Sequence, residues 1–167
     1  LLEVNGRLDG SSKFPSDSQY AFFPSVSAGW RVSQEPFWKV PEEIFSNLKV
    51  RASYGSLGNG NIDPYSFQEL FKIKQSSLVL NGIRPQYTGQ PAVIPLGLTW
   101  EKSTTLNLGL DFAFLSNRLQ FSGDIYQRKT TDMFTVGMSL PAVFGTDVPK
   151  GNYADLTTKG FELSVSW

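Results

Sequence analysis

The sequence predicts an all-β protein whose antiparallel strands run up and down in chain order. Apolar and polar residues alternate over six segments, which is the period of an extended strand with two different faces. Many of the 15 glycines and 10 prolines lie between these segments, where they mark turns and loops. The longest nearly apolar run, residues 92–98, contains Pro95 and Gly97 and is far shorter than the ~20 residues of a membrane helix.

The first two predicted strands comprise residues 1–8 and 21–33. Their apolar side chains share one parity: Leu2, Val4, Leu8, Phe22, Pro24, Val26, Ala28, Trp30 and Val32. The intervening segment DGSSKFPSDSQ (9–19) is polar and rich in turn-forming residues, so we expect a loop there. The two strands should therefore be neighbours in one sheet.

The third predicted strand, residues 48–57, follows a linker that contains two prolines and predicts one helical turn at 42–45. Its apolar positions alternate with Lys49, Arg51 and Ser53. A long irregular segment comes next, and within it SFQELFKIK (66–74) is compatible with a short helix or a strand. Such an excursion is uncommon in a compact domain and is typical of a functional loop.

The fourth and fifth predicted strands, residues 98–114 and 118–131, are joined by the tight turn LSNR and form a hairpin. The sixth strand comprises residues 158–167. In each of these three strands apolar side chains occupy alternate positions, which place them on one face. They are Trp100, Leu106, Leu108, Leu110, Phe112, Leu119, Phe121, Ile125, Phe161, Leu163, Val165 and Trp167. The chain is thus one domain, residues 1–167, whose long loops (about 9–19, 58–97 and 131–157) lie at one end of the sheet.

Composition excludes several classes of function. The chain has 15 basic and 15 acidic residues without a long run of either sign, which argues against a nucleic-acid partner. It has no histidine and no cysteine, so the usual zinc ligands, the usual general base and the thiol nucleophile are missing. We therefore expect no enzymatic activity, no metal and no cofactor.

The residues alone leave open what the apolar stripes touch. A soluble sandwich or meander would bury them in a protein core. A membrane barrel would turn them toward lipid, and three features favour it: long strands, aromatic residues near strand ends, and charged residues inside strands on the opposite parity. Both architectures remain possible at this level.

Six stretches in one order resemble a known family over nearly the whole chain. They are DGSSKF (9–14), FFPSVSAGWRVSQEPFW (22–38), LKVRASYGSLGN (48–59), LTWEKSTTLNLGLDF (98–112), RLQFSGDIYQRKTTDMF (118–134) and GNYADLTTKGFELSVSW (151–167). Together they resemble SusC/RagA-type TonB-linked (TonB-dependent) outer-membrane transporters. Each stretch is unspecific by itself, but the shared order and spacing identify the family.

This resemblance implies a plug-gated outer-membrane importer in a Gram-negative, Bacteroidetes-like bacterium. The chain would be a fragment from the C-terminal half of the transmembrane barrel, without the plug, and its outer face would contact lipid. The implied partners are the TonB complex, reached through N-terminal regions that this chain lacks, and a SusD-type surface lipoprotein. The implied substrates are oligosaccharides, or peptides in some members. The alternative is a soluble or surface-attached all-β carbohydrate-binding or adhesion module.

Candidate functional residues lie mainly in the three long loops. Tyr65, Tyr87 and Tyr153 each stand beside amide, carboxyl or guanidinium side chains, a combination that binds sugars by stacking and hydrogen bonding. Turn formation explains the same neighbours equally well. Further expectations concern the strands. Trp30, Trp100 and Trp167 are interpreted as interface anchors or sugar platforms, Arg31, Arg51 and Arg128 as lumen-facing, and Asp124 and Arg128 as an ion pair.

Overall fold

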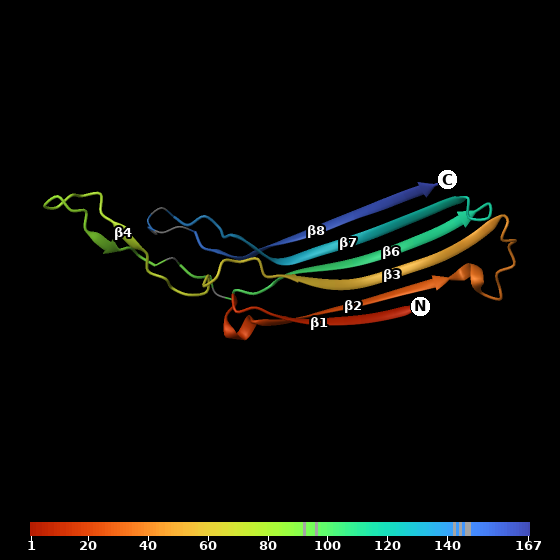
Figure 1. The fold of residues 1–167 in the computed structure, drawn as a ribbon, viewed down its shortest axis with the longest axis horizontal. Coiled ribbons are helices and arrows are strands. Elements are labelled where there is room, and N and C mark those ends of the chain that lie inside the picture. Colours follow the sequence, from red (N-terminus) through yellow and green to blue (C-terminus); the bar gives the residue numbers. More distant parts are fainter. Residues whose placement is uncertain (92, 96, 142, 144, 146–147) are drawn as a thin grey trace.

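The computed structural model describes residues 1–91, 93–95, 97–141, 143, 145 and 148–167. Six strands form one antiparallel sheet in the order β1-β2-β3-β6-β7-β8, so the all-β, up-and-down prediction is confirmed (Figure 1). The strands are β1 (Leu2–Gly10), β2 (Tyr20–Arg31), β3 (Phe45–Asn59), β6 (Glu101–Phe114), β7 (Leu119–Val136) and β8 (Lys150–Ser166). The sheet is not closed, because β1 and β8 are its two edges.

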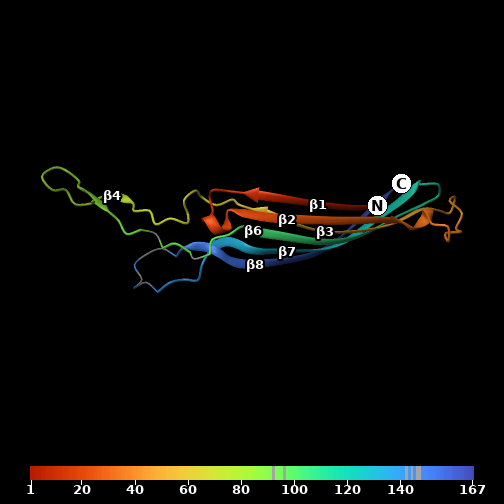
Figure 2. The same cartoon turned by 90° about the horizontal axis from the view of Figure 1, so that it is seen from below.

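The two ends of the sheet differ in their connections (Figures 1 and 2). The short-turn end carries the β2–β3 connection, with the 3₁₀ turn η2 (Val32–Gln34), and the β6–β7 turn. Both chain termini lie toward this end. The long-loop end carries the connections after β1, β3 and β7, the first of which contains the 3₁₀ turn η1 (Ser16–Ser18). The three segments expected to be long loops thus lie at one end of the sheet. Only the β3–β6 connection is much longer than the others, because the β2–β3 connection (32–44) is as long as the β7–β8 connection (137–149).

The segment between β3 and β6 contains a second, two-stranded sheet. It is made by β4 (Ile73–Gln75) and β5 (Gln86–Thr88), and it extends beyond the main sheet in Figure 1. The stretch 66–74, which sequence left open between helix and strand, is a turn followed by extended chain that enters β4. No helix in the described part of the chain is long and apolar enough to cross a membrane.

β7 and β8 are longer than their alternation predicts, so the loop between them spans 137–149 rather than 131–157. The reason is that the register between them shifts twice. An extra residue of β7 lies between Thr130 and Met133, and an extra residue of β8 lies between Asn152 and Ala154. Asp132, at the first of these shifts, has a positive φ of 58°. A bulge inserts extra residues on one strand and breaks the two-residue period. The alternation of apolar and polar residues therefore ends near residue 131, whereas β7 continues to Val136.

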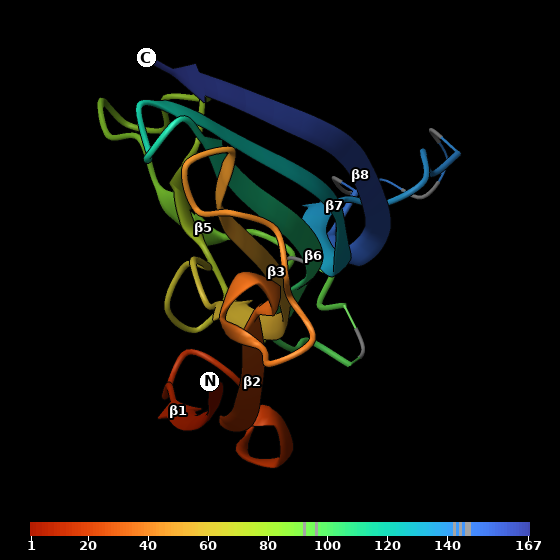
Figure 3. The same cartoon turned by 90° about the vertical axis from the view of Figure 1, so that its right-hand side faces the viewer.

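The sheet is a single twisted layer (Figure 3), and its hydrophobic core lies under the long loops. Phe14, Ile62 and Leu98 are buried there, and Phe67, Trp100 and Phe134 pack against them. In contrast, apolar side chains in the middle of the strands stay open: Phe161 is 81% exposed and Leu163 is 71% exposed. The loops thus form the packed part of this chain, while one sheet face offers uncovered apolar surface.

Candidate functional site

The strand register divides the paired side chains into two faces. Direct partners in an antiparallel pair share a face, and successive residues alternate between faces. The apolar face carries Leu2, Val4, Leu8, Phe22, Val26, Ala28, Trp30, Val50, Ala52, Tyr54, Leu106, Leu108, Leu110, Phe112, Phe121, Ile125, Phe161, Leu163 and Val165. The polar face carries every Asp and Glu of the register from β1 to β8: Glu3, Asp9, Glu101, Asp111, Asp124 and Glu162.

An ion-pair network joins three strands on the polar face. Arg51 of β3 donates from Nε and Nη2 to the two oxygens of Asp111 on β6, at 2.7 and 2.9 Å. It also donates from Nη1 and Nη2 to Asp124 on β7, at 3.1 and 2.9 Å. Ser122 donates to Asp111 at 2.7 Å, and Asn107 donates to Asp124 at 3.1 Å. We call these five residues the Arg51 network; it satisfies two carboxylates with one guanidinium.

A glycine creates the space for this network. Gly109 lies between Arg51 and Asp124 in the register. A Cβ added there would lie 2.6 Å from Asp124 Oδ1 and 2.7 Å from Arg51 Cζ. The flat guanidinium therefore passes directly over the Gly109 backbone, which any side chain would block.

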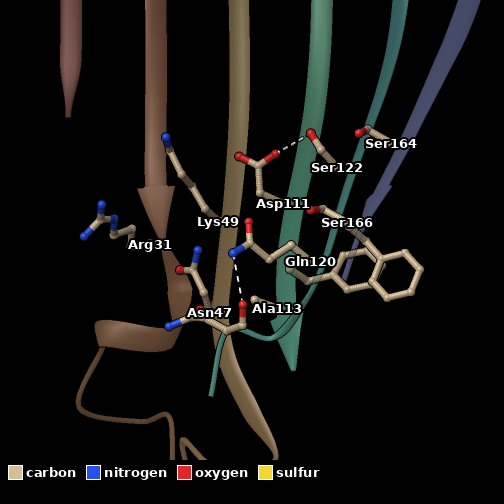
Figure 4. Close-up of a pocket in the computed structure, with 12 residues that line it drawn as sticks. Arg31, Asn47, Lys49, Asp111, Ala113, Gln120, Ser122, Ser164 and Ser166 are labelled. Atoms are coloured by element: carbon tan, nitrogen blue, oxygen red, sulfur yellow. Dashed lines mark hydrogen bonds between the residues drawn. The ribbon is translucent and has the colours of Figure 1, made fainter. Parts of the chain in front are cut away.

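The polar face is hollowed beside the network, toward the short-turn end. Figure 4 shows Lys49, Asp111, Ser122 and Gln120 among the residues that line a hollow of about 380 Å³. The lining is mostly polar, and it comes from β2, β3, β6, β7, β8 and the β6–β7 turn. Arg31 and Lys49 lie directly opposite each other there. Such a surface can hydrogen-bond polar protein or solute.

The expected positions of the arginines are confirmed as to face, but the expected ion pair is wrong. Arg31, Arg51 and Arg128 all occupy the polar face. Asp124, however, pairs with Arg51 and not with Arg128. Residues four apart on a strand share a face but are separated by ~13 Å, so equal parity does not bring them into contact. Asp124 instead lies opposite Glu162, which makes the Arg51 contact more important for β7.

Aromatic side chains gather on the apolar face at the short-turn end. Phe45, Phe112, Phe114 and Phe121 form one cluster with ring centroids 4.6 to 6.5 Å apart. Two of the three tryptophans proposed as anchors lie at the same end. Trp30 packs edge-on against Phe37 and donates to Glu35 at 2.8 Å, and Trp167 lies under the guanidinium of Arg118.

Trp100 has a different environment from the one expected for an anchor. Its ring packs against Phe14 and Phe23 at centroid distances of 4.8 and 5.9 Å, and its Nε1 donates to the Ser18 carbonyl at 3.0 Å. It precedes β6, so the alternation that places side chains on the sheet faces does not reach it. Trp100 therefore belongs to the core under the long loops.

The three candidate tyrosines lie on separate elements. Tyr65 occupies a turn with a positive φ of 62° and is 61% exposed. Tyr87 is in β5, opposite Lys74, and is 52% exposed. Tyr153 is in β8, and its ring lies close to Gly137 and Gly151. The described residues include no group of three or more metal-ligating side chains.

Comparisons with known proteins agree with this architecture. Residues 1–167 match the family described as TonB dependent receptor-like, beta-barrel. TonB-dependent receptor P26 of Formosa agariphila is 37% identical over 168 residues, which cover 99% of this chain and 16% of the relative. TonB-dependent receptor SusC of Bacteroides thetaiotaomicron is 34% identical over 176 residues, covering 99% of this chain and 17% of the relative.

A solved structure shares the arrangement of strands. The RagAB peptide importer in its closed-closed state matches with a TM-score of 0.81 and 26% identity, over 98% of this chain and 17% of that one. The RagAB peptide transporter matches at 0.80 with the same identity and coverage. The chain spans about a sixth of the length of the curated relatives that it matches. It belongs to the TonB-dependent receptor family and forms part of the β-barrel of that family.

Proposed function

We propose that this chain is a wall segment of a plug-gated, TonB-energised outer-membrane importer of nutrients. The apolar face contacts lipid, and the polar face lines the lumen. The division between the faces carries this proposal: every Asp and Glu of the six-strand register lies on one face, and the other face holds an apolar band. A soluble sheet covered by a second layer would not need aromatic residues at the band's edge, whereas a bilayer does.

The dimensions of the apolar band support a membrane. On β6 the band runs from Leu106 to Phe114, nine residues, against the ~9–11 that a tilted strand needs to cross a bilayer. The position at which the band ends, on the long-loop side, also differs from one strand to the next. Leu106 is the last apolar residue on β6, whereas on β7 it is Ile125, whose partner is Leu108. A level membrane surface crosses tilted strands in this staggered way.

The Arg51 network then has a structural role in the lumen wall. It ties β3, β6 and β7 together at a place where the sheet has no second layer to stiffen it. The unpaired edges of β1 and β8 continue into further strands of the barrel, since an open edge in lipid leaves backbone groups without partners.

We further propose oligosaccharides as the substrate class, taken up with a SusD-type lipoprotein at the long-loop end in a Gram-negative, Bacteroidetes-like cell. Similarity to SusC supports this choice, while the RagAB match makes peptide the competing class. Tyr65, Tyr87 and Tyr153 are the proposed sugar contacts, because each is at least half exposed in or beside the long loops. TonB acts through regions outside this chain. The role is transport, without catalysis.

The test uses the full-length protein that carries this chain. We expect it to fractionate with the outer membrane and to migrate faster on gels before heating than after. A parent that stays soluble without detergent would contradict the proposal and favour the soluble all-β binding module.

The substrate class has a separate test. We expect Y65A/Y87A/Y153A to reduce growth on a glycan that the wild type imports, with unchanged amounts of heat-modifiable protein. Y54A is the matched control, because Tyr54 lies on the apolar face. Equal growth of the triple variant would exclude these tyrosines, and growth only on peptides would replace the substrate class.

A further inference from the structure

Three lysines are the only Asp, Glu, Lys or Arg residues of the apolar face within the strand register. They are Lys102 of β6, Lys129 of β7 and Lys159 of β8, and all three side chains are exposed. The other charged residues of the register lie on the polar face. A random surface would scatter charges of both signs over both faces. Here the apolar face carries only positive charges, and all of them lie on the long-loop side of the apolar band.

The register places the three lysines in one diagonal row. The partner of Lys102 on β7 is Thr131, so Lys129 is its diagonal neighbour two residues away. The partner of Lys129 on β8 is Thr157, and Lys159 is again two residues away. Diagonal neighbours of this kind lie about 7–8 Å apart. Each of these like charges thus lies within reach of the next, and we call the three residues the lysine row.

The lysine row follows the limit of the apolar band toward the long-loop end. On β8, Lys159 is the next residue of this face after Phe161. On β7, only Gln127 separates Lys129 from Ile125, and on β6 only Thr104 separates Lys102 from Leu106. The row therefore shifts along the strands in the same direction as the band does. Three ammonium groups mark the level at which the apolar surface ends, on the long-loop side.

Carboxylates do not neutralise this row within the described residues. None of the three lysines takes part in an ion pair. The nearest acid on the same side of β8 is Asp155, whose Oδ1 accepts a hydrogen bond from the Asp132 backbone N–H at 3.2 Å in the bulge. Lys102 and Lys129 lie on inner strands, and none of their direct partners on either side is acidic. Asp155 is the diagonal neighbour of Lys129 on β8 but forms no ion pair with it.

We propose that the lysine row binds the phosphate groups of anionic lipid headgroups in the leaflet on the long-loop side. The inference rests on the proposed function, in which this face meets lipid. Lysine stems can lie along the apolar surface while their ammonium groups reach the headgroup level. Phosphates there relieve the repulsion within the row, and each lysine near such a surface strengthens binding about fivefold.

The test compares two triple variants of the full-length protein in detergent. K102Q/K129Q/K159Q removes the row. K72Q/K74Q/K150Q is the matched control, because it removes three exposed lysines from the same end but outside the row. Native mass spectrometry measures binding of phosphatidic acid, phosphatidylcholine and inorganic phosphate. We expect the row variant to lose at least about tenfold in phosphatidic acid affinity and the control to change less than about twofold.

K102R/K129R/K159R should retain binding, because the charges remain. Equal affinity of the row variant and wild type, an equal loss in the control, or equal binding of phosphatidylcholine would overturn the inference. Binding of inorganic phosphate as tight as that of phosphatidic acid would also overturn it, since the lipid would then contribute nothing. Outer-membrane fractionation and heat-modifiable mobility show independently whether the proposed function holds, so the two failures are distinguishable.

Discussion

Arg51 is the residue on which the polar face depends most. Its guanidinium satisfies Asp111 and Asp124 together, and without it two carboxylates would stand close to each other and to Glu162. The network is half-buried, so solvent weakens it only in part. The network couples three strands that are distant in sequence: Asp111 and Asp124 lie 60 and 73 positions after Arg51.

We expect Arg51→Met to destabilise the barrel by about 1–3 kcal/mol, because hydrogen bonds to charged groups are lost and two carboxylates are left without their cation. The temperature at which full-length protein loses its compact gel mobility measures this change. Arg128→Met is the control: Arg128 lies on the same face, is exposed, and forms no ion pair among the described residues. Equal effects of the two substitutions would show that the network adds nothing specific.

Gly58 is the second residue whose identity follows from its surroundings. An added Cβ would lie 2.0 Å from the buried Phe23 ring, which in turn contacts Trp100. We expect Gly58→Ala to displace that ring, to cost about 1–3 kcal/mol and to accelerate tryptic cleavage in the loop 60–100. At Gly123 the nearest atom, Leu163 Cδ1, is 3.9 Å away, so Gly123→Ala should leave cleavage unchanged. Unaltered cleavage of Gly58→Ala would contradict the proposed packing.

At the scale of elements, alternation predicted the six strands and their faces, because a half-exposed strand has a two-residue period. It failed at the bulge near Asp132, where an inserted residue breaks that period without ending β7. It also misplaced Trp100, which precedes β6 and turns into the loop core. Both errors concern backbone geometry that residue type does not encode.

The Arg51 network escaped prediction for a different reason. Parity placed Arg51, Asp111 and Asp124 on one face, but only the register between β3 and β6 brings Arg51 beside Gly109. Because 41 residues separate Asn59 from Glu101, the sequence does not determine which residues of β3 and β6 become partners. The tight turn between β6 and β7, in contrast, fixes which residues of these two strands are partners. The position of Asp124 opposite Gly109 could therefore have been predicted from the sequence.

The apolar band makes a prediction about β6. We expect Leu110→Lys to destabilise the protein by about 2–4 kcal/mol, because Leu110 lies in the middle of the band and a lysine there would face hydrocarbon. Thr105→Lys is the control on the opposite face of the same strand. The amount of heat-modifiable protein in the outer membrane measures both. Tolerance of Leu110→Lys would mean that this face does not meet lipid.

At the scale of the whole molecule, the two ends of the sheet are built for different surroundings. The short-turn end has the tight β6–β7 turn and an aromatic cluster on the apolar face. The long-loop end has a buried core of its own, centred on Phe14 and Leu98, together with the lysine row and the β4–β5 hairpin. Loops that pack a core of their own keep a defined shape, which suits the lipoprotein and substrate contacts that we propose for this end.

This asymmetry predicts the orientation of the chain in the membrane. The chain has no cysteine, so a single one can be introduced at either end. We expect Ser77→Cys, between β4 and β5, to react with a membrane-impermeant maleimide on intact cells, because the proposed function turns the long-loop end outward. Glu43→Cys, in the exposed turn before β3, should react only after the outer membrane is permeabilised. Other cysteines of the full-length protein are replaced by serine beforehand. The reverse pattern would invert the assignment of loops, and labelling of both sites on intact cells would argue against a spanning sheet.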